Sequence, residues 1–210
     1  MSIVFCVFAF LSGSIPWGYI IGRAKGIDLR KAGSGNIGAT NVMRVIGKKE
    51  ALVTLLLDML KGFVPVFIMR LLPYGENLIL FTTVGILAII GHCFTPFLKF
   101  KGGKGVATSL GVILASMPLA GMITILLWII TVKISRISSL GALVSFSLLP
   151  LTVYFLSYQE EFLIFSFLIT VLIYSRHISN IKRLFSGKEP KIGEKNKIIE
   201  ESDEKGSYTS

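Results

Sequence analysis

The chain has 210 residues, of which 52% are hydrophobic and only 16% charged, and its mean hydropathy is +0.72. So few charged groups cannot coat a soluble globule of this size, and we expect the chain to lie in a lipid bilayer. A net charge of +10 would suggest nucleic-acid binding in a soluble protein. Here the basic residues cluster at the ends of apolar stretches, where lipid headgroups and phosphorylated substrates are nearer partners, so nucleic-acid binding is not expected.

Apolar residues form six blocks, which are separated by short polar breaks. The blocks cover approximately residues 3–22, 51–72, 78–98, 107–132, 140–157 and 161–175. The first lacks a basic N-terminal region and a small-residue cleavage site, so we expect a spanning helix and not a signal peptide. Cys6 and Cys93 lie in apolar segments without the spacing of a disulfide framework or a zinc site, and we expect them to fill the core.

The distribution of Lys and Arg predicts the orientation of these blocks. Residues 23–49 contain Arg23, Lys25, Arg30, Lys31, Arg44, Lys48 and Lys49 against the single acid Asp28. By the positive-inside rule this segment lies in the cytoplasm, which places the N-terminus outside. The turn at 73–77 then falls outside and Lys99, Lys101 and Lys104 fall inside, in agreement with the rule.

The fourth block conflicts with this orientation if it crosses once, because Lys133, Arg136 and the basic C-terminal residues would then lie outside. A helix break at residues 116–118 removes the conflict, since Pro118 cannot continue a helical hydrogen-bond ladder. The prediction is an all-α integral membrane protein, a seven-transmembrane-helix bundle with its N-terminus outside and its C-terminus cytoplasmic. The two halves of the block, of about 12–15 residues each, reach only ~18–22 Å, so we expect tilted partners inside the bundle.

We expect a single polytopic membrane domain over residues 1–185, with no convincing internal repeat. Residues 186–210 are rich in Lys and Glu and poor in large apolar side chains. This composition predicts a flexible cytoplasmic tail.

The segment 33–44 is the first of several polar clusters predicted to face the cytoplasm. It contains the spacing G-x-G-x-x-G, but no strand precedes it, so we regard the match to dinucleotide-binding proteins as accidental. Its glycines still allow backbone N–H groups to approach an anion, and Gly38 can open a helix whose N-terminus favours negative charge. Asn41 and Arg44 lie three residues apart on one face of that helix. A flexible polar loop is the alternative interpretation.

The segment 100–108 is a glycine-rich turn with Lys101 and Lys104 that leads into a helix, a pattern typical of phosphate binding. Lys104 is followed by Gly105 and not by Ser or Thr, so the segment is not a nucleotide-binding P-loop. A basic membrane anchor with a glycine helix cap is the alternative.

The segment 176–183 continues the last apolar block. Helical spacing places Arg176, Asn180 and Arg183 on one face, with His177 beside Asn180. A histidine so close to arginines favours its neutral form, which suits hydrogen bonding or proton transfer. A basic belt next to the membrane would explain the Lys and Arg residues but not the His and Asn.

Three further features carry weaker signals. Ser138 and Ser139 could simply cap the helix that starts near residue 140. Asp58 and Lys61, three residues apart in the second block, are expected to pair structurally. His92 could be a core histidine whose ring nitrogens are hydrogen-bonded, or a catalytic group. The sequence shows no carboxylate cluster for a metal and no Ser/His/Asp hydrolase pattern.

Four strings together resemble the bacterial acyl-phosphate:glycerol-3-phosphate acyltransferase family, PlsY. They are GSGNIGATNVMR at 33–44, Asp58-x-x-Lys61-Gly62, FKGGKGVAT at 100–108 and RHISNIKRLFSGKE at 176–189. The resemblance runs from about Gly13 to Glu189, with several independent motifs in the family's order.

This resemblance implies a multi-pass enzyme of the bacterial inner membrane that acylates glycerol 3-phosphate from acyl phosphate at the cytoplasmic face, beside membrane lipids. The products would be 1-acyl-sn-glycerol 3-phosphate (lysophosphatidic acid) and phosphate, in the first acylation of phospholipid synthesis. No cofactor or metal is implied, and neither acyl-CoA nor acyl carrier protein is expected as the direct donor. The implied catalytic residues are Ser34, Asn36, Arg44, Lys104, His177 and Asn180. The implied substrate-binding residues are Asn41, Gly102, Gly103, Gly105, Ser139 and Arg183.

As a mechanism, we expect Lys104, Arg44 and Arg183 to hold and neutralise two phosphates, so that the acyl phosphate has a good leaving group. No acyl-enzyme is then needed, and either a substrate phosphate oxygen or His177 accepts the hydroxyl proton.

Two other classes of function remain open. A membrane transporter of phosphorylated metabolites would show inverted repeats and sites open to both faces. A lipid-binding scaffold would explain the basic residues but not the glycine spacings.

Overall fold

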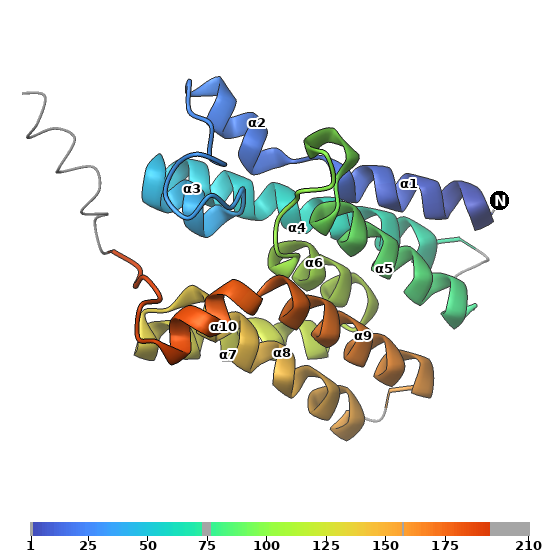
Figure 1. The fold of residues 1–210 in the computed structure, drawn as a ribbon. Helices are drawn as coiled ribbons and strands as arrows, with labels where there is room; N and C mark the ends of the chain where they lie inside the picture. Colours follow the sequence, from blue (N-terminus) through green and yellow to red (C-terminus); the bar gives the residue numbers. More distant parts are fainter. Residues whose placement is uncertain (1, 73–76, 157, 194–210) are drawn as a thin grey trace, which may run out of the picture.

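The computed structural model describes residues 2–72, 77–156 and 158–193, and the regular structure within these ranges is helical throughout (Figure 1). In chain order the helices are α1 (Ser2–Ser14), α2 (Trp17–Ala24), α3 (Ala39–Val45), α4 (Lys48–Arg70), α5 (Leu78–Cys93), the short 3-10 helix η2 (Pro96–Leu98), α6 (Val106–Ser116), α7 (Pro118–Ser135), α8 (Ser138–Phe155), α9 (Glu160–Arg176) and α10 (Ile178–Phe185). The all-helical prediction is therefore confirmed. Most of the turn predicted at 73–77 lies outside the described residues.

Five segments of the described chain are long and apolar enough to cross a bilayer, and a sixth is added if the bent pair of α9 and α10 counts as one span. The five are Ser2–Ala24, Lys48–Arg70, Leu78–Leu98, Pro118–Ser135 and Ser138–Phe155. Large apolar side chains such as Leu60, Leu126 and Val171 are exposed on the outer surface. In water this surface would be unfavourable, whereas in lipid it is the expected one.

The predicted break in the fourth apolar block is confirmed. Helix α6 ends at Ser116 and α7 begins at Pro118, so that an 11-residue helix precedes one of 18 residues. Most residues of α6 are buried, which fits the expectation of a short helix inside the bundle. Arg70 of α4 donates to the backbone oxygen of Ala115 (3.1 Å), so a carbonyl in the last turn of α6 has a partner in spite of the break.

The first apolar block is not the single helix that we expected. Pro16 interrupts it between α1 and α2, because proline has no N–H to continue the helical ladder. Two side chains from other parts of the chain donate to carbonyls beside the break. Thr95 donates to Ser14 O (2.6 Å), and the Lys61 ammonium donates to Ile15 O (2.7 Å). These hydrogen bonds compensate for part of the helical ladder that is lost at the kink.

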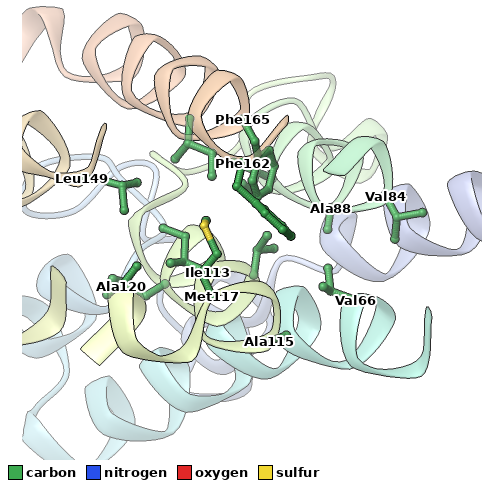
Figure 2. Packing of buried hydrophobic residues seen from close by; sticks show 14 of the residues in the cluster. Val66, Val84, Ala88, Ile113, Ala115, Met117, Ala120, Leu149, Phe162 and Phe165 are labelled. Carbon is green, nitrogen blue, oxygen red and sulfur yellow. The ribbon is translucent and has the colours of Figure 1, made fainter. Parts of the chain in front are cut away.

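The main core is apolar and is built by α1, α4, α5, α6, α7, α8 and α9. Figure 2 shows side chains from α4, α5, α6, α7, α8 and α9 converging around Ile113. Glycines bring pairs of helices into close contact. A Cβ added at Gly111 of α6 would lie 2.0 Å from the backbone oxygen of Met59 in α4. Helices α4 and α6 therefore pack almost backbone to backbone.

This contact predicts that Gly111→Val destabilises the protein by about 3 kcal/mol or more, because the added side chain must push α6 away from α4. The measurement is thermal unfolding in detergent. Leu126→Val, at an exposed position on α7, is the matched control and should leave the midpoint nearly unchanged. Equal midpoints for the two variants would contradict this account of the packing.

Candidate functional site

A cavity of about 660 Å³ gathers the polar clusters that the sequence singled out. Its lining includes ten of the predicted site residues: Ser34, Asn36, Asn41, Arg44, Lys104, Gly105, Ser139, His177, Asn180 and Arg183. These residues come from four separate stretches between α2 and the end of the described chain, namely 34–44, 104–105, 139 and 177–183. In Figure 1, α3 and α10, which contribute to the cavity, lie at the end of the bundle away from the N-terminus. The predicted convergence of the clusters is therefore confirmed.

Asn41 holds the loop before α3 in shape. Its carboxamide is 2% exposed, accepts from the backbone N–H of Ser34 (2.8 Å) and donates to the backbone oxygens of Ala32 (3.0 Å) and Asn36 (2.7 Å). Gly33 allows the loop to turn, since its φ of +59° is unfavourable for other residues. Asn41 lines the cavity, but its hydrogen bonds go to the loop. These hydrogen bonds fix the backbone of Ser34 and Asn36, while the predicted part of Asn41 in substrate binding stays a prediction.

The glycine-rich turn before α6 is fastened to the end of α5. Gly102 donates its N–H to Cys93 O and Gly103 donates to His92 O, both at 3.1 Å. A Cβ would lie 2.0 Å from the His92 backbone oxygen at Gly102, and 2.1 Å from the His92 ring at Gly103. The family resemblance implies that Gly102 and Gly103 bind substrate, but in this structure their N–H groups are hydrogen-bonded to the end of α5. Neither glycine lines the cavity, because both serve the fold of the turn.

Lys104 leaves this turn and enters the cavity, where its ammonium donates to Asn180 Oδ1 (2.7 Å). Burial lowers the pKa of Lys104 to about 8. The Glu189 carboxylate raises that pKa, and the charges of Arg183 and Arg44 lower it further. A partly desolvated cation beside two arginines is well suited to bind a phosphate dianion.

The C-terminal cluster does not continue α9 as one straight helix. The chain bends by 64° after Arg176, so the prediction that Arg176, Asn180 and Arg183 share one face is wrong. Asn180 and Arg183 line the cavity, whereas Arg176 does not. His177 sits in the bend, with its Nδ1 2.7 Å from the backbone oxygen of Ile173. If Nδ1 carries the proton, Nε2 is left as a hydrogen-bond acceptor on a cavity-lining ring.

Glu189 is the site residue that the sequence interpretation missed, since it assigned this residue to the tail. Its carboxylate accepts from Ser139 Oγ (2.7 Å), Asn180 Nδ2 (2.6 Å) and Arg183 Nε (2.7 Å). Burial alone would raise the pKa of Glu189, but these three hydrogen bonds outweigh it and hold the pKa below its usual value. The signal available was the position of Glu189 at the end of the string 176–189.

Ser138 and Ser139 do not cap the helix near residue 140, which was one interpretation of the sequence. Helix α8 begins at Ser138, and no side chain caps it. The Ser138 hydroxyl instead shares a hydrogen bond with Thr40 (3.0 Å), while Ser139 binds Glu189. Both serines therefore tie the start of α8 to other parts of the cavity wall.

Part of the cavity lining is apolar. Leu52 and Leu55 of α4, Trp128 of α7 and Ala142 of α8 all line it. Such a surface beside a cationic region suits a ligand with a charged head and an apolar chain.

Asp58 and His92 also reach the cavity lining. Asp58 pairs with Lys61 (2.7 Å), as the sequence predicted, and its carboxylate lies 3.8 Å from His92 Nδ1. All three side chains are buried. Within the described part of the chain, no group of three or more His, Cys, Asp or Glu residues could hold a metal ion.

A family model described as glycerol-3-phosphate acyltransferase matches residues 3–187. The chain belongs to this family. The glycerol-3-phosphate acyltransferase of Endomicrobium trichonymphae is 46% identical over 193 residues, which cover 91% of this chain and 96% of the relative. The protein of the same description from Sinorhizobium fredii is 46% identical over 189 residues, covering 90% and 91% of the two chains. The protein is therefore an acyltransferase, as the four sequence motifs predicted.

Two solved structures are similar over nearly the whole chain. Both are of PlsY (YgiH), described as an integral membrane glycerol 3-phosphate acyltransferase. Its glycerol 3-phosphate form has a TM-score of 0.88 and 38% identity, covering 91% of this chain and 96% of that one. Its lysophosphatidic acid form has a TM-score of 0.85 and 37% identity, covering 91% and 95%. Together with the apolar helices, this likeness makes the chain a multi-pass integral membrane protein.

The hydrogen bonds of Asn41 predict that Asn41→Ala loosens the loop at 28–38. The variant removes one acceptor and one donor group, which between them join four loop residues (Leu29, Ala32, Ser34 and Asn36). Trypsin should therefore cut after Arg30 and Lys31 roughly 10 times faster than in the wild type. Thr40→Ala, which removes one hydrogen bond on the neighbouring position, is the control and should change the cleavage rate little. Equal rates for Asn41→Ala and wild type would refute the positioning role.

Proposed function

We propose that the protein transfers a fatty acyl group from acyl phosphate to glycerol 3-phosphate, giving 1-acyl-sn-glycerol 3-phosphate and inorganic phosphate. One observation carries this proposal: a single cavity combines cationic side chains with an apolar wall. The cations suit the phosphates of both substrates, and the apolar wall suits the acyl chain of the donor. Such a donor needs no nucleotide and no carrier-protein docking surface. The reaction is the first acylation in phospholipid synthesis.

Three cationic side chains are available to bind the two substrate phosphates. Arg44, Lys104 and Arg183 line the cavity from α3, the glycine-rich turn and α10. An arginine can bind a phosphate through two parallel N–H groups, whereas Lys104 acts as a point charge. Together they offset the repulsion between two dianions that must approach each other before the acyl group can move.

In the transfer step, the glycerol hydroxyl oxygen attacks the acyl carbonyl carbon. The bond between that carbon and the phosphate oxygen then breaks, and the phosphate leaves with the bonding electron pair. Lys104 and the two arginines stabilise the charge on the departing phosphate, so no acyl-enzyme is required. The hydroxyl proton passes to a phosphate oxygen or to His177 Nε2, while Ser34 and Asn36 orient the substrates.

We place this cavity at the cytoplasmic face of the bacterial inner membrane, within a bundle of seven membrane helices whose N-terminus lies outside. The course of residues 106–135 supports this topology. Gly105, just before α6, and Ser138, just after α7, line the same cavity. The two helices thus leave and return to one face, as the distribution of Lys and Arg requires. Most of the tail predicted over residues 186–210 lies outside the described residues, which end at 193.

The direct test is phosphate release by the purified protein from palmitoyl phosphate, with and without glycerol 3-phosphate. Release should require the acceptor, and Lys104→Ala should lower it at least about 100-fold because the leaving phosphate loses its charge partner. Lys133→Ala, at an exposed basic position outside the cavity, is the matched control and should retain activity.

Absence of release from folded protein would refute the proposal. Uptake of glycerol 3-phosphate into proteoliposomes by that same protein would identify a transporter instead.

The pKa of Lys104 also predicts a pH dependence. Above pH 7 both substrate phosphates are dianions, since their second pKa is about 6, so Lys104 becomes the group that titrates. Its charged form is lost as the pH rises through about 8, and kcat/KM should fall roughly tenfold per pH unit above that value. Lys104→Arg, which stays charged, should lack this fall if it retains turnover. A flat wild-type profile up to pH 10 would contradict the assignment.

A further inference from the structure

Arg176, the last residue of α9, contacts the backbone of the glycine-rich turn. Its Nε donates to the backbone oxygen of Gly103 (3.2 Å) and its Nη2 to that of Gly102 (3.4 Å). Its guanidinium also lies over the ring of Phe94, 5.0 Å from the centroid. Arg176 is not part of the cavity lining, so it is not placed to contact a ligand there.

These contacts complete the hydrogen bonding of a turn that is not helical. The N–H groups of Gly102 and Gly103 are used by the end of α5, and their carbonyl groups would otherwise lack partners. A backbone segment of this kind at a membrane face holds one conformation only when its polar groups are satisfied. The planar fork of Arg176 reaches both carbonyls at once, which a lysine cannot do.

The turn ends at Lys104, the residue on which the proposed phosphate chemistry depends. Lys104 must leave the turn in the direction of Asn180, which belongs to α10. Arg176 is the last residue of α9, four positions before Asn180. The same stretch of chain therefore fixes both the base of the Lys104 side chain, through Arg176, and its tip, through Asn180.

We propose that Arg176 is a positioning residue for acyl transfer: it fastens the Gly102–Gly103 carbonyls to the end of α9 and so holds Lys104 against Asn180. This inference rests on the proposed function for its effect on turnover. It assigns Arg176 no contact with substrate. Its influence on the reaction passes through Lys104.

The test is a double-mutant cycle between Arg176 and Lys104. In the wild-type background, Arg176→Gln should lower kcat/KM roughly 10- to 100-fold, the usual range for a group that orients a functional residue. It should also weaken glycerol 3-phosphate binding, measured by calorimetry in detergent. In the Lys104→Ala background the same change should alter that binding less than about twofold, because the residue through which Arg176 acts is gone.

Two further variants separate geometry from charge and from folding. Arg176→Lys keeps the charge but loses the fork, and should behave like Arg176→Gln. Phe94→Leu removes the ring under the guanidinium and should give a smaller loss in the same direction, which keeps the proposal testable if Arg176→Gln folds poorly. Lys182→Gln, an exposed basic position on α10, is the matched control and should match the wild type.

The results that would overturn the positioning role of Arg176 differ from those that would overturn the proposed acyl transfer. Equal losses of binding in the two backgrounds, or wild-type turnover of Arg176→Lys, would overturn the positioning role. If the wild-type protein bound glycerol 3-phosphate without transferring an acyl group, the proposed function would fail. The coupling between Arg176 and Lys104 would still be measured from binding alone.

Discussion

The two hydrogen bonds from Gly102 and Gly103 to the last carbonyls of α5 are the constraint on which the site depends. A helix end leaves carbonyl groups without partners, and in a bilayer water is not available to satisfy them. The glycine-rich turn meets this need, and only glycine can do so because His92 lies against both residues. The direction in which Lys104 leaves the turn follows from the same contact. The need to pair the last carbonyl groups of α5 thereby helps to determine where Lys104 lies.

The sequence predicted most of the fold, because the main signals are local. Apolar blocks become helices in lipid, and the break at Pro118 follows from the missing proline N–H. The interruption at Pro16 carried the same signal but was outweighed by the continuous apolar pattern around it. The bend at His177 has no proline or glycine to announce it, so helical spacing gave the wrong face for Arg176.

The site residues were largely predicted from motifs, but their tasks depend on contacts that spacing does not contain. Asn41 was expected near substrate, yet its hydrogen bonds go to the loop because the chain before α3 turns back over it. Glu189 was assigned to the tail because local composition there is polar and charged. Its contacts with Ser139 and Asn180 exist only once α8 and α10 are packed together. Such long-range contacts are not encoded in the period of a single helix.

Glu189 explains how several cations can line one cavity while Lys104 stays protonated. Burial and the neighbouring arginines Arg44 and Arg183 all lower the pKa of Lys104, and a stronger effect would leave the lysine neutral near pH 7. The Glu189 carboxylate acts in the opposite direction, and it also fixes Arg183 through a 2.7 Å hydrogen bond. This partly buried acid thus keeps the lysine largely protonated below pH 8 and leaves a net positive cavity. A phosphate dianion meets cations that are already charged and already oriented, which is the condition for stabilising a leaving phosphate.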